Sequence, residues 1–323
     1  MFLKIFQNIY RSGILTNSLR LSSQVALIDS DNATKNHLEA ICNELNAPCK
    51  YIPISTTGQD DDSNFSKIYD QLCDLGVGLL LDANQKSIIR MRQKLGIFAQ
   101  VINVIPKSHV DNRYSASELD FVIVRESAEG GLIGLENKVG NGITQSIKLI
   151  TKEQTKKVAK LALAVAKERQ RKKLTIVHKA NIMKITDGYF LDICRDEAES
   201  WPAVKCESII IDNCCMQLIS NPKQFDVLVM PNDYGDIIAG IASGLCSNSI
   251  LPSVLYSDKF TIFQPALCGS NFYGNMLTLA KMLENLKMVE ESQRLIDAVN
   301  QMDGSLENAE FQILSILRAQ NYK

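Results

Sequence analysis

The chain has 323 residues, of which 46% are hydrophobic, so it can bury one large core or two smaller ones. A formal net charge of −1 argues against a nucleic-acid partner, and no apolar run is long enough to span a bilayer. Nine cysteines and three histidines show no spacing typical of a zinc site or a disulfide framework, which favours reduced thiols in an intracellular compartment.

The N-terminal segment, residues 1–24, carries Lys4, Arg11 and Arg20 but no acidic residue, and its first apolar residues cluster on one helical face. This pattern is typical of a mitochondrial transit peptide. The alternative is an ordinary N-terminus with this composition by chance. We expect residues 1–24 to direct the chain to the mitochondrial matrix.

Hydrophobic periodicity predicts strands that alternate with helices along the rest of the chain. Strands are expected at 25–28, 51–54, 78–81, 121–124, 174–178, 207–211 and 225–230. Helices are expected around 38–45, 68–75 and 90–92, from 151 onward, near 187–199, 212–220 and 234–244, and over most of 272–320. This alternation predicts an α/β protein with largely parallel strands.

Two features mark the ends of the helix that begins at Thr151. Gln154, three residues after Thr151, suggests a capping box. At the other end, Arg169, Arg171, Lys172 and Lys173 form a basic run, which we interpret as cations that suit the carboxyl end of a helix dipole.

The most informative segment is His178–Leu191, which follows the apolar strand at 174–177. Such a strand delivers Lys179 and Asn181 to the carboxyl edge of the sheet, where open α/β sheets bind ligands. The segment resembles the HKANIMK sequence of the isocitrate and isopropylmalate dehydrogenase family. Residues 211–218 and 224–232 narrow this resemblance within the family, because they are similar to the non-catalytic subunits of mitochondrial NAD-dependent isocitrate dehydrogenases. The resemblance is close over 120–245 and weak outside it.

The resemblance implies a two-domain fold of parallel-rich sheets flanked by helices. The outer domain would comprise 25–103 plus 246–323, and the inserted domain 104–245. A two-stranded arm at about 139–150, with Gly140-Asn141-Gly142 as its turn, would pair with another subunit. Helices near 187–220 would complete that interface.

The resemblance also implies catalytic sites shared between two subunits, with NAD and Mg or Mn at the level of the complex. One set of residues in such a site comes from the subunit itself, and the other set comes from its partner. Of the first set, this chain keeps Arg92 and Arg125 for substrate binding and Asp236 for metal binding. The positions of the other family residues are occupied by Lys86, Ile88, Ile102, Leu132 and Gly240, in place of Ser, Asn, Arg, Tyr and Asp. A leucine cannot transfer a proton, and an isoleucine cannot bind a carboxylate.

The half donated to a partner's site is complete, with Lys179 and Asn181 as catalytic residues and Asp212 as a metal ligand. This contrast predicts an accessory subunit that binds a catalytic isocitrate dehydrogenase subunit and completes its isocitrate site in trans. Alternatively, Asp212 is only a helix cap and Lys179 and Asn181 only close a turn, as in a fold-retaining paralogue outside the complex. A self-sufficient dehydrogenase fits least. Asp187 is expected to be a cap or turn residue.

The two segments that bind the cofactor in the family also differ in this sequence. Residues 28–33 lack the glycines of the family's first turn, and residues 263–270 lack its histidine. Carboxylates near a phosphate would repel it. We therefore expect this chain alone to bind neither NAD nor metal tightly, and no cofactor-binding residue is assigned.

Overall fold

A computed structural model describes residues 24–28, 32–55, 62–81, 91–104, 114, 118–246, 251–266, 272–302 and 309–321. The strands are β1 (Gln24–Ile28), β2 (Lys50–Ile54), β3 (Val77–Leu80), β4 (Ala99–Val104), β5 (Phe121–Glu126), β6 (Glu136–Gly140), β7 (Ile143–Ser146), β8 (Lys173–His178), β9 (Lys205–Ile210), β10 (Val227–Met230), β11 (Pro252–Tyr256) and β12 (Thr261–Pro265). The helices are α2 (Asn32–Glu44), α3 (Asp62–Leu75), α5 (Lys152–Glu168), α6 (Thr186–Glu199), α7 (Ile211–Ser220), α8 (Asn232–Leu245), α9 (Phe272–Asn285), α10 (Val289–Gln301) and α11 (Ala309–Asn321), with a short 3₁₀ turn at Pro222–Gln224. The predicted transit segment lies outside the described residues, apart from Gln24.

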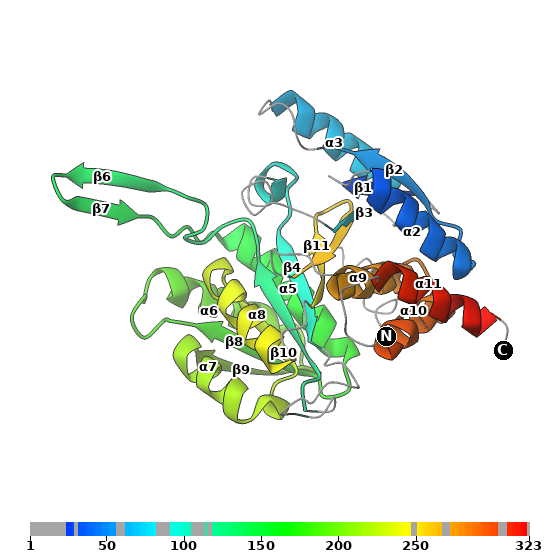
Figure 1. Cartoon of the computed structure of the whole chain (residues 1–323). Helices are drawn as coiled ribbons and strands as arrows, with labels where there is room; N and C mark the ends of the chain where they lie inside the picture. Colours follow the sequence, from blue (N-terminus) through cyan, green and yellow to red (C-terminus); the bar gives the residue numbers. More distant parts are fainter. Residues whose placement is uncertain are drawn as a thin grey trace.

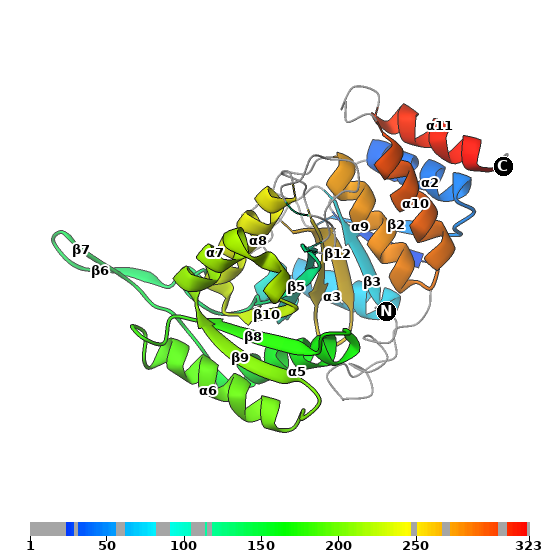
Figure 2. The ribbon, with the colours of Figure 1, turned by 90° about the horizontal axis from the view of Figure 1, so that it is seen from below.

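One continuous ten-stranded sheet organises the molecule, in the order β2-β1-β3-β12-β11-β4-β5-β10-β8-β9. The strands at both ends of this order pair in parallel, whereas β12, β11, β4 and β5 pair antiparallel with one another in the centre. The prediction of an α/β fold rich in parallel strands is therefore confirmed. The sequence did not predict β4, β11 or β12, and these three join the two parallel parts of the sheet (Figures 1 and 2).

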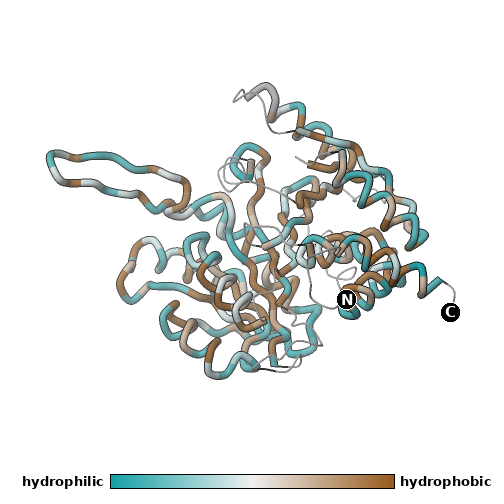
Figure 3. The backbone as a smooth tube through the Cα atoms, viewed as in Figure 1, coloured by the Kyte–Doolittle hydropathy of each residue, from teal (hydrophilic) through white to brown (hydrophobic). Residues whose placement is uncertain are grey.

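Helices cover both faces of the sheet. Helix α5 packs on β5, β8 and β10 together with α6, while α7 and α8 lie on the opposite face of the same strands. Helices α9, α10, α11 and α2 group beside β1–β3 and β12 (Figure 2). Hydrophobic stretches follow the strands of the sheet (Figure 3). None of the helices that the structure describes has the length and apolar character required to cross a bilayer.

The predicted arm is a β-hairpin that projects away from the sheet (Figure 1). Its strands β6 and β7 pair antiparallel, and every residue in them is exposed. Gly142 adopts φ +80°, a conformation that favours glycine in a tight turn. The hairpin confirms the local prediction, and its pairing with another subunit stays a prediction.

The start of α5 differs from the predicted capping box. Thr151 caps the helix, since its hydroxyl accepts the Gln154 backbone N–H at 3.4 Å. The reciprocal bond is not made by the Gln154 side chain: Glu129 accepts both the Thr151 N–H at 2.7 Å and the Thr151 hydroxyl at 2.6 Å. A carboxylate supplied by a distant loop thus fixes this helix start.

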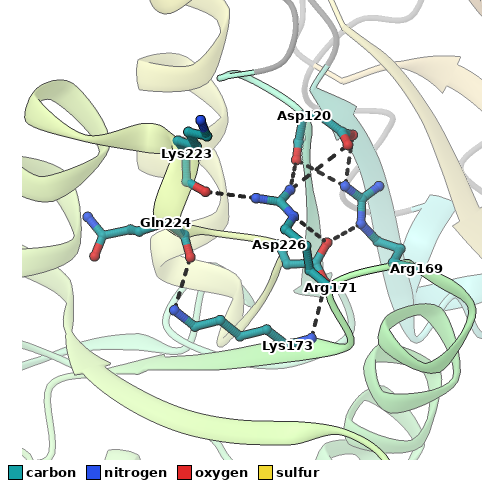
Figure 4. A network of polar contacts seen from close by, with 7 residues as sticks. All are labelled: Asp120, Arg169, Arg171, Lys173, Lys223, Gln224 and Asp226. Atoms are coloured by element: carbon teal, nitrogen blue, oxygen red, sulfur yellow. Dashed lines mark hydrogen bonds and ion pairs between the residues drawn. The ribbon is translucent and has the colours of Figure 1, made fainter.

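The basic run lies at the carboxyl end of α5, as predicted, and it also binds the sheet. The Arg169 guanidinium forms ion pairs with the fully buried Asp226 and with Asp120. Arg171 binds the Asp120 and Lys223 carbonyls, and the Lys173 N–H donates to Asp226 at 3.1 Å (Figure 4). These bonds tie together the starts of β5, β8 and β10. The run lies at the helix terminus that the sequence predicted, and its side chains in addition hold the strand starts.

Candidate functional site

The candidate site lies where the parallel strands β5, β10, β8 and β9 end. Because these strands run in the same direction, their carboxyl ends meet at one edge of the sheet. Arg125 lies near the end of β5, Lys179 directly follows β8, and Asp212 closely follows β9. Asp236 lies in α8, the helix that follows β10.

Lys179 and Asp212 form an ion pair between the ends of neighbouring strands. The side chain of Lys179 is 27% exposed and that of Asp212 is 64% exposed. The hydrogen bond from Lys179 lowers the pKa of the Asp212 carboxyl. Asp212 lies in the first turn of α7, whose N-cap is Ile210, so it is not the cap residue that the alternative interpretation required. Its charge suits the helix dipole there.

The residues around Lys179 form a loop before α6. The Ala180 N–H donates to Nδ1 of His178 at 3.0 Å, and burial lowers the pKa of this imidazole. Asn181 is exposed. The loop therefore presents Lys179 and Asn181 outward, beside Asp212.

Arg125 and Asp236 form a second ion pair, with both terminal nitrogens of the guanidinium bound to both carboxylate oxygens. Arg125 is buried, and its Nε also donates to Asn232 at 2.9 Å. Gly235 is required here, because a Cβ at this position would overlap with the aliphatic stem of Arg125. The two residues that the resemblance assigns to substrate and metal binding thus bind each other.

Gln100 connects the two retained arginines. Its side-chain oxygen accepts from Arg92 at 3.1 Å and from Arg125 at 3.5 Å, and its amide nitrogen donates to Ser253 at 2.8 Å. The sequence analysis did not single out Gln100, because its partners lie on separate segments of the chain. Arg92, Arg125 and Asp236 therefore form one internally bonded group.

Asp187, in the first turn of α6, is fully buried. Its carboxylate accepts from the Lys179 N–H at 2.7 Å and from the Tyr234 hydroxyl at 2.6 Å, and it pairs with Lys148 at 2.7 Å. Burial, and the hydrogen bond to Asp187, raise the pKa of the Tyr234 hydroxyl. The expectation of a simple cap or turn residue was wrong, because Asp187 joins distant segments at this edge.

Glu126, at the end of β5, is a buried carboxylate whose Oε1 accepts from the N–H groups of Ala128 at 2.5 Å and Glu129 at 2.9 Å. Its Oε2 has no hydrogen-bond partner among the described residues. Burial raises the pKa of Glu126 to about 7. The sequence offered no signal for this, since burial of the strand end depends on tertiary packing.

The described residues do not fit a complete metal site. Asp236 is bound by Arg125, the exposed Gly240 supplies no carboxylate, and no cluster of three or more His, Cys, Asp or Glu side chains that could hold a metal occurs in the described part of the chain. Ile102 is fully buried in β4, while Leu132 is 40% exposed. Lys86 and Ile88 lie outside the described residues, as do residues 29–31 and 267–270.

Residues 81–308 match the family model described as isocitrate/isopropylmalate dehydrogenase. The mitochondrial NAD isocitrate dehydrogenase subunit beta of Homo sapiens is 40% identical over 225 residues, covering 66% of this chain and 58% of the relative. Regulatory subunit 2 of the corresponding Arabidopsis thaliana enzyme is 35% identical over 228 residues, covering 66% of this chain and 62% of the relative.

The chain thus spans about three-fifths of the length of these curated relatives. Among solved structures, the isocitrate dehydrogenase of Methylococcus capsulatus superposes with a TM-score of 0.77 at 23% identity, covering 91% of this chain and 99% of that one. A protein of Thermus thermophilus gives a TM-score of 0.78 at 20% identity, covering 91% of this chain and 68% of that one. At these identities the structural likeness concerns the fold alone.

Proposed function

Because the chain belongs to the isocitrate/isopropylmalate dehydrogenase family, we propose that it is an accessory subunit of a mitochondrial NAD-dependent isocitrate dehydrogenase. In this proposal it binds a catalytic subunit in the matrix and completes that subunit's site for isocitrate in trans. The relatives named as beta and regulatory subunits of such enzymes support this assignment.

The observation that carries the proposal is the contrast between two ion pairs at one edge of the sheet. Arg125 is buried and satisfied by Asp236 and Asn232, so it has little capacity left for a substrate carboxylate. Lys179 and Asp212 face solvent, where an ion pair is weak because water screens it. A competing substrate or metal ion can therefore separate Lys179 from Asp212 more easily than Arg125 from Asp236, because the Arg125 guanidinium is buried.

In the partner's site, Lys179 would hold or transfer a proton at the substrate, and Asn181 would help to orient the bound substrate. Asp212 would supply one carboxylate oxygen to a divalent ion, which prefers such oxygen ligands. Mg or Mn polarises the substrate hydroxyl when bound, and NAD accepts the hydride. Neither group is expected to bind tightly to this chain alone.

The proposal is tested by co-expressing the chain with its catalytic subunit and comparing Lys179→Met and Asp212→Asn with the unaltered chain. Each variant should assemble normally and lower turnover by about 10² or more, as expected on loss of an acid–base group. Lys156→Met, which alters an exposed lysine on α5, is the control and should retain full turnover. Full activity in both site variants would refute the proposal and favour a structural paralogue.

A further inference from the structure

We propose that the arm is mechanically coupled to the Lys179 loop through Asp187 and Lys148, so that a partner docked on the arm sets the position of Lys179. This inference rests on the proposed function. Asp187 and Lys148 are positioning residues in it, because both act through Lys179 and neither would touch the substrate.

The first step concerns the loop. The Lys179 backbone N–H donates a hydrogen bond of 2.7 Å to the buried carboxylate of Asp187. Asp187 itself is at the start of α6, eight residues further along the chain. A charged acceptor makes this bond stronger than a neutral one, so the peptide that carries Lys179 is held in place by Asp187.

The second step concerns both ends of the arm. Lys148 follows β7, and its ammonium lies 2.7 Å from Asp187 and 2.9 Å from Asp233. Gly131 precedes β6, and its N–H donates to Asp233 at 2.6 Å. Gly130 and Leu149 are also joined by a short antiparallel bridge at the root of the arm. The arm therefore enters and leaves the body beside the carboxylates of Asp187 and Asp233, the first of which fixes the Lys179 peptide.

The third step concerns rigidity. The Tyr234 hydroxyl donates to Asp187 at 2.6 Å, and the Lys148 ammonium lies 4.6 Å from the centre of the Tyr234 ring. Lys148 is 13% exposed and Asp187 is fully buried, so water can replace these bonds only poorly. A displacement at the root of the arm moves Lys148, and the network transmits it to the loop rather than absorbing it.

The arm itself has no support within the described part of the chain, since β6 and β7 are exposed along their whole length. Its apolar side chains include Val139, Ile143 and Ile147. A partner that covers these residues fixes the position of the arm and, through Lys148 and Asp187, that of the Lys179 peptide before substrate binds. Docking and site completion become one event.

The experiment uses the complex with the catalytic subunit and the variants Lys148→Met and Asp187→Asn. Both should lower kcat about 10- to 100-fold through misplacement of Lys179, while KM changes less than about twofold. Lys148→Arg keeps the charge and should restore most of kcat. Lys156→Met and the exposed Asp297→Asn are the matched controls and should behave like the unaltered chain.

Amide hydrogen exchange provides a readout that does not depend on activity. Partner binding should slow exchange over residues 179–187, and Lys148→Met should speed it several-fold in the complex and in the isolated chain. Unchanged exchange in Lys148→Met, or a kcat loss that Lys148→Arg does not restore, would overturn the coupling. If Lys179→Met retains full turnover, the proposed function fails, and exchange alone still decides whether the arm and the loop are coupled.

Discussion

At the scale of single residues, the pairing of Arg125 with Asp236 has a measurable cost when it is broken. Asp236→Ala leaves a buried guanidinium without its counter-ion, which should lower the free energy of unfolding by about 1–3 kcal/mol, less than for a fully buried pair because Asp236 is half exposed. Urea denaturation measures this. Asp297→Ala, whose carboxylate accepts from Gln293 of the same helix, is the control.

The double variant Arg125→Met with Asp236→Ala also removes the guanidinium that Asp236→Ala leaves without a counter-ion. Its loss of stability should be smaller than the sum of the two single losses, because the two residues interact directly. Strict additivity would contradict the ion pair.

Glu126 makes stability depend on pH. Its pKa is raised from the ordinary 4.5 to about 7 in the folded state, so the folded chain binds more protons than the unfolded chain between these values. Stability is therefore fully present below about pH 4.5 and falls as pH rises to 7, by on the order of 3 kcal/mol. Glu126→Gln keeps the acceptor oxygen but cannot ionise.

Unfolding titrations in urea between pH 5 and pH 8 check this. Glu126→Gln should lose much less stability over that interval than the unaltered chain. The exposed Glu153→Gln should follow the unaltered chain. An equal slope in all three would show that Glu126 does not titrate in this range.

The sequence predicted those site residues that directly follow strands. Lys179 and Asp212 meet because β8 and β9 are parallel neighbours. The alternation of strands and helices in the sequence predicts such parallel strands, whose carboxyl ends lie at one edge of the sheet. Asp187 and Lys148 could not be found in this way, since their bond joins residues 39 positions apart. The same holds for Gln100, whose partner Ser253 lies 153 positions away.

At the scale of elements, Asp226 fastens the amino ends of β5, β8 and β10 through Arg169, Arg171 and the Lys173 N–H. It is fully buried, so Asp226→Asn removes the buried counter-ion of the Arg169 guanidinium and should destabilise the fold by about 3–5 kcal/mol. Asp120→Asn is a matched control in the same network. Because the Asp120 side chain is 56% exposed, its loss should cost less than about 1 kcal/mol.

Thermal and urea denaturation of both variants separate these outcomes. Equal, small losses in Asp226→Asn and Asp120→Asn would mean that the basic run contributes little to the sheet. In that case the favourable position of these cations at the carboxyl end of α5 would be their main contribution.

Most strands and helices followed from hydrophobic periodicity, because each lies in a long alternating pattern. The missed strands β4, β11 and β12 form the antiparallel centre of the sheet, and two of their pairings, β11 with β4 and β12 with β3, join segments far apart in the sequence. Such pairing leaves no local signature, and short apolar runs do not distinguish strand from buried helix. The division into two domains stays a prediction. In the structure, one sheet runs unbroken from β2 to β9.

At the scale of the whole molecule, the arm should decide assembly without affecting the fold. Val139 and Ile143 are 58% and 60% exposed, so Val139→Asp with Ile143→Asp should leave the melting temperature nearly unchanged. The same pair of charges should abolish a hetero-oligomer with the catalytic subunit, because buried unpaired charges are costly at an interface. Light scattering after size-exclusion chromatography measures this.

The control places aspartate at Val289 and Phe311, which are 59% and 72% exposed on α10 and α11. That variant should assemble like the unaltered chain. A complex that survives the arm substitutions would place the interface elsewhere and would also remove the basis for coupling through the arm.

The position of β11 and β12 in the sheet has a consequence for how the chain is made. These strands insert between β3 and β4, although Ser253 of β11 comes 153 positions after Gln100 of β4 in the sequence. Until Pro265 has left the ribosome, β3 and β4 each present a bare edge, which is prone to pair with other chains. Closing pairs so distant in sequence is slow. A nascent chain therefore exposes edges that can aggregate until almost all of the sheet has been synthesised.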